Sequence, residues 1–538
     1  MAVITPQTDV YLLKVPLEID NTNQLTFANA TAQYNYFNSL PKLSVDNFTY
    51  QRKDGTIRYG ANFDDLVEYN YVMYRNDAYS SKWFYAYITG MEYLNDNVTA
   101  ISIKTDVFQT WQFDLTYKQV FVEREHVNDD TFGLHTIPEN LETGDYIRGN
   151  NGVDYVFGGQ WWLGFQVTEL VSNMNDDNTG GRIYNGIYNG LILVLVDSYR
   201  TADLLISAYD DAGKHEAIIS CFYLPKKVEP NPIINQGVTL HGVSCDVYFP
   251  RTSNQARIME ESINITRPTS IDGYIPKNNK MFTKEFCYIY ASNNSGSDVT
   301  YNYEDFRNST TGLPDSNATF AVIGTISQGC SIKLVPTNEY LAPIGSDSAI
   351  AGGYNYGISA GKMPLCSWNS DYYTNWVTQN AVNMASSGIS TAINTVSNLA
   401  TGNVIGATGS LINGITDVVN KNYQASLVPN QAKGNVNAGD INFSSNKFFS
   451  IYPMTIKNEY ARICDKYLSM FGYKVSTVKV PNVTGRRNWN FVKTIGCYID
   501  ADIPQTDLQE IKDMFDKGVT FWHNPSTFAD YSQNNDII

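Results

Sequence analysis

Short apolar stretches separated by turn-forming residues run through the first 280 residues, and this pattern predicts strands. Residues 83–88 and 99–103 flank an Asn-Asp-Asn turn, which predicts a β-hairpin. A short helix is expected at 106–111 and a strand at 120–124. Residues 191–196 are apolar at every position, so we expect a strand that is buried on both faces. This part of the chain is therefore predicted to be mostly β-structure.

The last part of the chain mixes helical and strand patterns. Residues 457–470 predict a helix that ends at Gly472, because glycine adopts the left-handed backbone of a helix cap at little cost. A strand at 473–478 is expected to follow. Thr506 and Gln509 have the spacing of a capping box, which predicts that a second helix begins there. We expect an α+β unit at this end of the chain.

A segment between residues 371 and 428 differs from the sequence on both sides of it. No Asp, Glu, Lys or Arg occurs from Tyr372 to Thr416, and Ala, Gly, Ser, Thr and Asn dominate. Apolar side chains recur there at helical spacing in two sets, and small residues between the sets fall every fourth position on one helix face. The candidate site residues of this segment are Val377, Ala381, Met384, Ile389, Ala392, Ile393, Val396, Leu399, Gly402, Val404, Ile405, Gly406, Ser410, Leu411, Ile412, Gly414, Ile415, Val418 and Val419.

The residues alone leave three interpretations of this segment open. Its many hydroxyl and amide groups cost about 1–3 kcal/mol each to bury unpaired, which argues against a permanent membrane span. Several helices packed through their small residues would satisfy those groups, so the segment could be a loop that enters a membrane only on assembly. The alternatives are a helical hairpin buried in a soluble core and a flexible linker.

The chain is acidic, with 54 Asp and Glu against 38 Lys and Arg and a net charge of −16. Its 43% apolar and 17% charged residues are typical of globular proteins. An acidic surface repels the phosphate backbone, which disfavours tight nucleic-acid binding but suits a passage that DNA traverses without sticking. The seven cysteines form no Cys-x-x-Cys pair and predict reduced thiols, and residues 1–6 lack the pattern of a signal peptide.

Candidate catalytic motifs are weak. Residues 357–361 match the nucleophile-elbow pattern around Ser359, but a Gly-rich stretch precedes them and Pro364 follows, where the motif needs a strand and a helix. The five histidines show no metal-ligand spacing. We therefore expect no catalytic residue, no metal site and no cofactor.

Two charged motifs have structural explanations that outweigh catalytic or binding ones. Residues 123–126 are Glu-Arg-Glu-His beside a strand, which favours an ion-pair network over a catalytic acid with an orienting Arg. Arg486 and Arg487 precede Trp489, and the same residues would serve a phosphate site. An exposed basic turn is the simpler prediction for them.

Several separated motifs occur in the order found in one protein family. The chain resembles the distal tail-tube, or tail-knob, proteins of short-tailed, Picovirinae-type bacteriophages that infect Gram-positive bacteria. Each motif is weak alone, but their number and order along nearly the whole chain argue against chance similarity. The matching stretches are Arg75–Asp77, Lys82–Thr89, Glu92–Asp96, Thr105–Trp111, Phe121–Val127, Phe471–Val475, Trp489–Thr494 and Gly518–His523.

The resemblance implies a β-rich α+β fold in a multidomain subunit of a ring-shaped tail tube. A long low-charge helical or loop insert would precede a C-terminal α+β unit. The implied divisions are a tube-forming β-rich domain at 1–127, a β-rich middle domain at 128–280, a β-rich segment leading into the loop at 281–370, a membrane-active loop at 371–445 and a tube-closing α+β unit at 446–538.

The resemblance also implies a structural function without enzyme activity. Six copies would form the tube, the apolar loop would plug its lumen, and release of the loop would penetrate the host membrane for genome ejection. The implied partners are further copies of the chain, the proximal tail or lower collar protein, the host cell membrane, and viral DNA that passes without specific binding. The protein would be made in the host cytoplasm and lie at the distal tip of the virion tail. A tail-associated cell-wall hydrolase and a receptor-binding tail adhesin are the alternatives.

Overall fold

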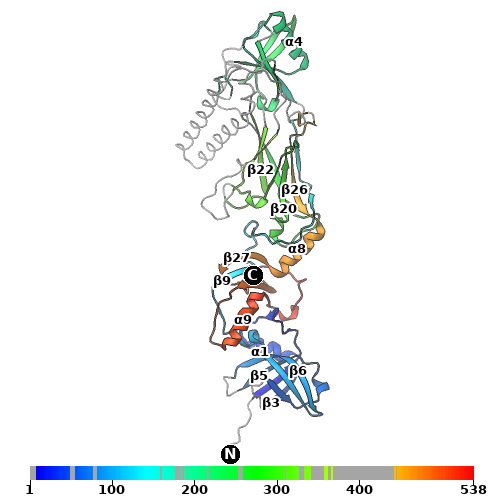
Figure 1. The fold of residues 1–538 in the computed structure, drawn as a ribbon, viewed down its shortest axis with the longest axis vertical. Coiled ribbons are helices and arrows are strands. Elements are labelled where there is room, and N and C mark those ends of the chain that lie inside the picture. The colour runs from blue at the N-terminus through cyan, green and yellow to red at the C-terminus, as the bar shows by residue number, and fades with distance from the viewer. Residues whose placement is uncertain are drawn as a thin grey trace, which may run out of the picture. The chain divides into compact units, whose positions relative to one another are not determined.

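The chain forms two compact units in the computed structural model (Figure 1). The terminal unit contains Met1–Thr143, Pro276–Met281 and Asn458–Ile538, and the inserted unit contains Gly144–Ile275 and Phe282–Lys457. The finer division into five segments stays a prediction. The structure describes residues 8–48, 55–76, 81–157, 160–175, 183–184, 187–188, 191–214, 217–251, 258–308, 311–325, 332–340, 357–360, 365–367, 442–443 and 445–538.

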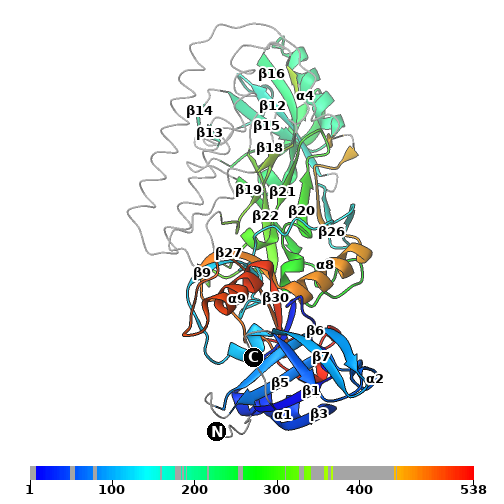
Figure 2. The same cartoon turned by 60° about the horizontal axis from the view of Figure 1, so that its bottom comes forward.

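The first sheet of the terminal unit has six strands in the order β3-β1-β5-β6-β7-β4, and its pairs are antiparallel (Figure 2). Strands β6 and β7 form a long hairpin in which Asn95 lies opposite Val98, so the predicted hairpin is confirmed. The strands are β1 (Thr8–Leu13), β3 (Lys42–Phe48), β4 (Thr56–Tyr59), β5 (Tyr71–Asn76), β6 (Trp83–Asn95) and β7 (Val98–Thr105).

The second sheet of the terminal unit joins residues from both ends of the sequence, in the order β2-β30-β28-β9-β27. Strand β2 pairs with β30 in parallel, and the other pairs are antiparallel. Strand β27 lies at one edge of this sheet. The strands are β2 (Asn23–Leu25), β9 (Val120–Glu125), β27 (Tyr473–Lys479), β28 (Trp489–Ile495) and β30 (Val519–Trp522), and a separate small pair joins β8 (Thr116–Tyr117) to β29 (Ile499–Asp500).

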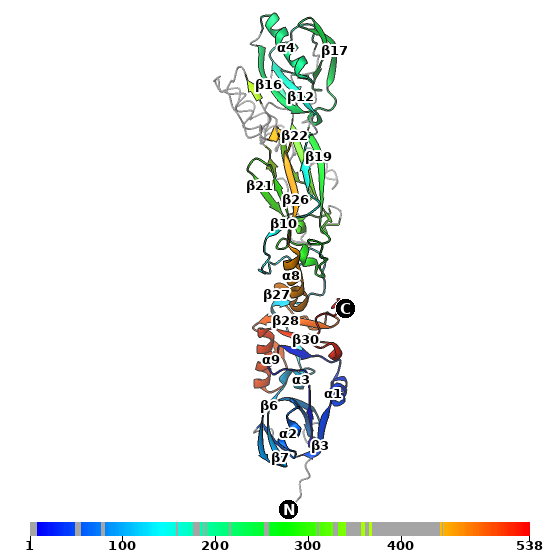
Figure 3. The same cartoon turned by 90° about the vertical axis from the view of Figure 1, so that its right-hand side faces the viewer.

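The helices of the terminal unit begin and end at residues with local reasons to do so. Asp106 precedes the short helix α3 (Val107–Trp111), and its carboxylate accepts the N–H of Gln109 at 3.0 Å. Gly472 follows α8 (Asn458–Phe471) with a φ of 65°, so the predicted cap is confirmed. Helix α9 (Gln505–Lys517) lies along β28 and β30 in Figure 3. The other helices described in this unit are α1 (Ala30–Ser39), α2 (Phe63–Leu66) and the 3-10 helices η4 (Asn279–Phe282), whose last residue belongs to the inserted unit, and η7 (Pro525–Thr527).

The predicted capping box at Thr506 is wrong. Helix α9 begins one residue earlier, at Gln505, and Pro504 occupies the cap position, where its carbonyl accepts the N–H of Leu508 at 2.9 Å. Thr506 therefore lies inside the first turn, and its hydroxyl contacts Asp507 at 3.3 Å instead of capping the helix.

Apolar side chains of α9 fill the space between the two sheets of the terminal unit. Ile511, Met514 and Phe515 are buried against Val492 and Phe521 of the second sheet, and the same cluster includes core residues of the first sheet. Burying side chains of this size stabilises a fold by about 1.5–3 kcal/mol each. The two sheets and α9 therefore form one core.

The inserted unit contains three larger sheets. Helix α4 (Tyr199–Asp211) packs on the six-stranded sheet, whose order is β17-β18-β15-β12-β16-β25 (Figure 2). All five residues of β15 are buried, which confirms the prediction for 191–196. The strands of that sheet are β12 (Trp161–Val167), β15 (Ile192–Val196), β16 (Ile218–Pro225), β17 (Ile233–Leu240), β18 (Val243–Phe249) and β25 (Leu365–Ser367).

The other two larger sheets of the inserted unit are also antiparallel. One has the order β10-β26-β20-β21, with β11 also on β26, and the other has the order β19-β22-β23-β24. The β-rich α+β fold class is thus confirmed. The elements are β10 (Tyr146–Arg148), β11 (Val153–Tyr155), β19 (Ile258–Thr266), β20 (Cys287–Ser292), β21 (Asp298–Tyr301), β22 (Asn317–Thr325), β23 (Ile332–Pro336), β24 (Ile358–Ser359), β26 (Phe449–Ile456), the pair β13 (Ile183–Tyr184) and β14 (Ile187–Tyr188), and the 3-10 helices η3 (Lys226–Val228) and η5 (Tyr303–Asp305).

Candidate functional site

The candidate membrane-active residues, from Val377 to Val419, all lie outside the described residues. In the part of the chain that the structure describes, no helix combines the length and apolar character needed to cross a membrane. The site that can be built from described residues is a charged centre in the terminal unit, close to the Glu-Arg-Glu-His motif.

The centre is organised around the carboxylate of Glu139, which has no solvent exposure. The Arg124 guanidinium and the Lys280 ammonium both pair with this carboxylate, and their side chains are 10% and 2% exposed. The backbone N–H of Lys474 donates to it at 3.0 Å. A second Arg124 nitrogen donates to the carbonyl of Gly472 at 2.7 Å. One carboxylate thus compensates two buried cations. We call this cluster of Glu139, Arg124 and Lys280 the Glu139 centre.

The two glutamates of the motif also form ion pairs. The buried carboxylate of Glu125 pairs with Lys479 and accepts the N–H of Asn482 at 2.8 Å. Glu123 pairs with Lys493 at 2.9 Å, and both side chains of this pair are about one-third exposed, at 33% and 37%. The predicted ion-pair network at the strand end is confirmed.

His126, the last residue of the motif, is held as a neutral imidazole. Its Nδ1 accepts the N–H of Phe491 at 2.9 Å, so Nε2 carries the proton and donates to the carbonyl of Ser469 at 3.0 Å. Burial is the main cause that lowers the pKa of His126 to about 3. Both ring nitrogens are occupied by backbone groups, so this histidine positions β9 against β28 and α8 and has no nitrogen available for a substrate.

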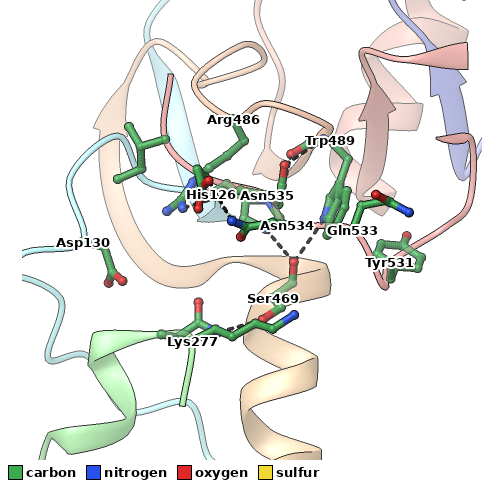
Figure 4. Close-up of a pocket in the computed structure, with 13 residues that line it drawn as sticks. His126, Asp130, Lys277, Ser469, Arg486, Trp489, Tyr531, Gln533, Asn534 and Asn535 are labelled. Atoms are coloured by element: carbon green, nitrogen blue, oxygen red, sulfur yellow. Dashed lines mark hydrogen bonds between the residues drawn. The ribbon is translucent and has the colours of Figure 1, made fainter. Parts of the chain in front are cut away.

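A polar cavity of about 260 Å³ lies beside His126, between the end of α8 and the last residues of the chain (Figure 4). The half-buried Arg486 lines this cavity, and its guanidinium donates to the carbonyl of Asn535 at 3.4 Å. Trp489 is 1% exposed, and its indole N–H donates to the carbonyl of Ser469 at 3.1 Å. The prediction of an exposed basic turn is therefore wrong for Arg486, which the chain end covers, whereas Arg487 is exposed.

Two buried or half-buried aspartates that the sequence analysis missed fix the segment 276–281 in the terminal unit. Asp465 on α8 accepts the backbone N–H groups of Lys277 at 2.9 Å and Asn278 at 3.1 Å. Asp130 accepts the N–H of Asn279 at 3.1 Å and the hydroxyl of Tyr473 at 2.6 Å. The sequence carries no local signal for these contacts, because the partners of Asp465 are nearly 190 residues away.

Other candidate chemistry is not assembled in the described residues. No group of three or more His, Cys, Asp or Glu side chains among them could hold a metal ion. Ser359 lies within β24, opposite Lys333 of β23, and so not at a strand-to-helix elbow. Five cysteines are free thiols, in line with the prediction for them: Cys221, Cys245, Cys287, Cys464 and Cys497.

Comparisons with known proteins cover the whole chain. A family model described as the C-terminal domain of the Bacillus phage phi29 tail knob protein gp9 matches residues 250–536, which is more than half of the chain. A second model, described as the N-terminus of the Caudoviral major tail protein, matches residues 6–116.

Individual relatives carry the same name. The tail knob protein gp9 of Bacillus phage B103 is 25% identical over 623 residues, and the one of Bacillus phage PZA is 26% identical over 596 residues. Each comparison covers 98% of both proteins. The solved structure of the bacteriophage C1 tail knob protein gp12 matches 99% of this chain and 100% of that one, with a TM-score of 0.64 and 15% identity, so the fold is shared.

Proposed function

The chain belongs to the family of the Bacillus phage phi29 tail knob protein gp9, and from this premise we propose that it forms the distal end of a short phage tail and carries a loop that penetrates the host membrane. It is a structural protein of the virion tail, and its relatives belong to multimeric tail assemblies. In the proposed assembly six copies surround a lumen and bind the proximal tail or lower collar protein. Viral DNA passes through the lumen without specific binding.

The observation that carries the membrane part of the proposal is the uncharged run from Tyr372 to Thr416, in a chain with 92 charged residues (54 acidic and 38 basic). A run of this length without charge is suited to a low-dielectric environment, where each charged side chain costs about 2.5–3.5 kcal/mol at a helix centre. Its hydroxyl and amide groups find partners when several copies pack together. In the proposed function the loop fills the lumen before ejection and enters the membrane on release.

The experiment is dye release from anionic liposomes across pH, comparing the full chain with a deletion of residues 377–428. Leakage is expected with the full chain and not with the deletion, while electron microscopy finds both assembled. A substituted pair sharpens the test: Ile393→Lys with Val396→Lys places charges at apolar positions of the helix that the sequence predicts, and it should abolish leakage. The matched control, Asn394→Lys with Asn398→Lys, places the same charges at polar positions and should retain most of it.

Two results would contradict the membrane function. Absence of leakage under every condition removes the proposed penetration step. A deletion variant that cannot assemble, together with absent leakage, indicates that the segment is a structural core and the tube a passive conduit.

The proposed function includes no covalent step. Around the Glu-Arg-Glu-His motif, the carboxylates are engaged by cations and the imidazole by backbone groups, which leaves none of them poised to transfer a proton. A purified chain is therefore expected not to clear suspensions of Gram-positive cell walls, as measured by turbidity. Clearing by the purified chain would favour the cell-wall hydrolase instead.

A further inference from the structure

Three exposed apolar side chains form a row across the second sheet of the terminal unit. Phe121 on β9 lies directly opposite Val478 on β27 and Ile495 on β28. Directly opposite residues project from the same face of a sheet. The exposed fractions are 38% for Phe121, 63% for Val478 and 57% for Ile495. Single exposed apolar residues are normal, but an adjacent row of three indicates an interaction surface.

A row of basic side chains lies beside the apolar row on the same face, and two of them are already paired: Arg124 is buried against Glu139, and Lys493 pairs with Glu123 at 2.9 Å. Arg124 is opposite both Lys474 and Lys493, and Lys493 shares a face with Ile495 because the two are separated by one residue on β28. A cavity of about 640 Å³ adjoins this row and is also lined by Lys517. Lys474 and Lys517 form no ion pair with any described residue. We call these two rows, with Lys517, the apolar–cationic face.

The opposite face of the sheet is already covered. Val492 packs against α9, and the hydroxyl of Thr494 donates to Asp516 of α9 at 2.7 Å. Both residues alternate with Lys493 and Ile495 along β28 and so point to the other side. The apolar–cationic face is therefore on the side of the sheet opposite α9. The end of α8 covers part of that side, where Phe471 and Phe491 have ring centroids 5.2 Å apart, and the exposed part reaches the edge strand β27.

The tip of the β6–β7 hairpin has the complementary chemistry. Tyr93 and Leu94 are 53% and 42% exposed at the tip, and the acidic residues Glu92 and Asp96 flank them, both exposed. The Tyr93 hydroxyl donates to Asp96, and the Asn97 N–H donates to Asn95 at 2.9 Å, so the tip has a defined shape. It presents two apolar side chains next to two carboxylates.

We propose that the apolar–cationic face binds the β6–β7 hairpin tip of a second copy of this chain. Apolar side chains would meet apolar side chains, and the tip carboxylates would meet Lys474 and Lys517, which pair with no carboxylate in the described part of the chain. The net charge of −16 otherwise makes copies repel. Figure 1 places β9 and β27 at one end of the terminal unit and β6 toward the other, and Figure 3 shows the same for β27 and the β6–β7 hairpin. Two different patches on one chain form a heterologous contact, which propagates head to tail and closes into a ring when the rotation permits.

The inference rests on the assembly part of the proposed function and is independent of the loop. Assembly is measured by sedimentation velocity of the full chain, and dye release is measured separately. Absent dye release contradicts the loop proposal and says nothing of the assembly of the full chain, whereas normal assembly of the face variants contradicts this inference.

The first test is Val478→Asp, which places a charge in the apolar row on an edge strand where the side chain is mostly exposed. We expect the protein concentration needed for half of the chains to assemble to rise more than tenfold, while circular dichroism reports an unchanged fold. Ile275→Asp is the matched control, because Ile275 is 74% exposed in the inserted unit and lies outside both patches. It should assemble as the unmodified chain does.

The second test exchanges the charges of the two patches. Lys474→Glu with Lys517→Glu should weaken assembly, as should Glu92→Lys with Asp96→Lys, and the chain with all four changes should recover it. Recovery identifies the hairpin tip as the occupant. The proposal is overturned by a wild-type chain that stays monomeric at high concentration, by face variants that assemble normally, or by hairpin variants that assemble normally.

Discussion

At the scale of single residues, the terminal unit depends on charges that are buried but compensated. Glu139 has no exposure and faces Arg124 and Lys280, whose side chains are 10% and 2% exposed. Removing an ion from water costs several kcal/mol, and the attraction between partners offsets this only while every partner is present. The net stability from such a centre is therefore small, whereas the loss on breaking it is large.

We expect Glu139→Gln to destabilise the terminal unit by about 3–5 kcal/mol, because two buried cations lose their counter-charge. Urea unfolding followed by tryptophan fluorescence measures the change, since Trp489 and Trp522 lie in this unit. Glu123→Gln is the matched control: it removes a pair that is 33% and 37% exposed and should change stability by about 0–1 kcal/mol. Equal effects of the two substitutions would contradict the role of Glu139.

The inserted unit contains carboxyl groups of the opposite kind, which are largely buried and form no ion pair with any described residue. Burial raises the pKa of Glu304 and of Glu339 to about 7 from an ordinary 4.5, and the nearby Asp305 adds to the shift of each. One oxygen of each carboxyl has no hydrogen-bond partner among the described residues. Both groups therefore favour the protonated form in the folded unit below about pH 7.

The stability of the inserted unit should depend on pH accordingly. Between pH 4.5 and 7 the folded unit retains protons on Glu304 and Glu339 that the unfolded chain releases, so this contribution to stability falls as pH rises to about 7. Urea midpoints at pH 5, 6, 7 and 8 measure it. Glu304→Gln with Glu339→Gln should flatten the dependence, and Glu169→Gln, at a site 51% exposed, should not. A wild-type midpoint that is the same at pH 5 and pH 8 would sink this prediction.

At the scale of elements, the local sequence pattern correctly predicted those strands and helix ends that depend on interactions between residues close in sequence. The hairpin of β6 and β7, the buried strand β15 and the end of α8 at Gly472 follow from alternation, apolar runs and glycine backbone freedom. The capping box failed because Pro504 had already fixed the helix start. The Glu139 centre could not be predicted, since Lys280 is 141 residues from Glu139 and only the fold brings them together.

Gly472 shows how an element boundary becomes a packing constraint. Its φ is 65°, and a Cβ there would lie 2.3 Å from the carbonyl of Glu125. Gly472→Ala should therefore cost about 2–5 kcal/mol of unfolding free energy, from the left-handed backbone and the clash together. Gly496 has a φ of 68° with nothing within 4 Å of its Cβ position, so Gly496→Ala should cost only about 1–2 kcal/mol. Thermal unfolding of the two variants compares them, and equal losses would mean that the clash is relieved.

At the scale of the whole molecule, the chain passes between the two units four times, at 143–144, 275–276, 281–282 and 457–458. Residues 276–281 belong to the terminal unit although the sequence on both sides of them belongs to the inserted unit. Asp465 is 1% exposed and accepts the N–H groups of Lys277 and Asn278, as well as the side-chain amide of Asn278 at 2.8 Å. This carboxylate, together with Asp130 and Glu139, therefore fixes a six-residue segment in the terminal unit, although the sequence on both sides of the segment belongs to the inserted unit.

Asp465→Ala should release that segment locally. Hydrogen bonds to a charged acceptor stabilise by about 1.5–3 kcal/mol, so amide exchange at Lys277 and Asn278 should accelerate about ten- to one-hundredfold. The amides of β15 should exchange at their original rates, because that strand belongs to the inserted unit and Asp465 to the terminal unit. Asp513→Ala on α9, which removes only an exposed bond to Gln509 at 2.8 Å, is the control. Uniform acceleration across the terminal unit would mean that Asp465 supports the whole unit, and unchanged exchange at both amides would mean that the segment is held by Asp130 and Lys280 instead.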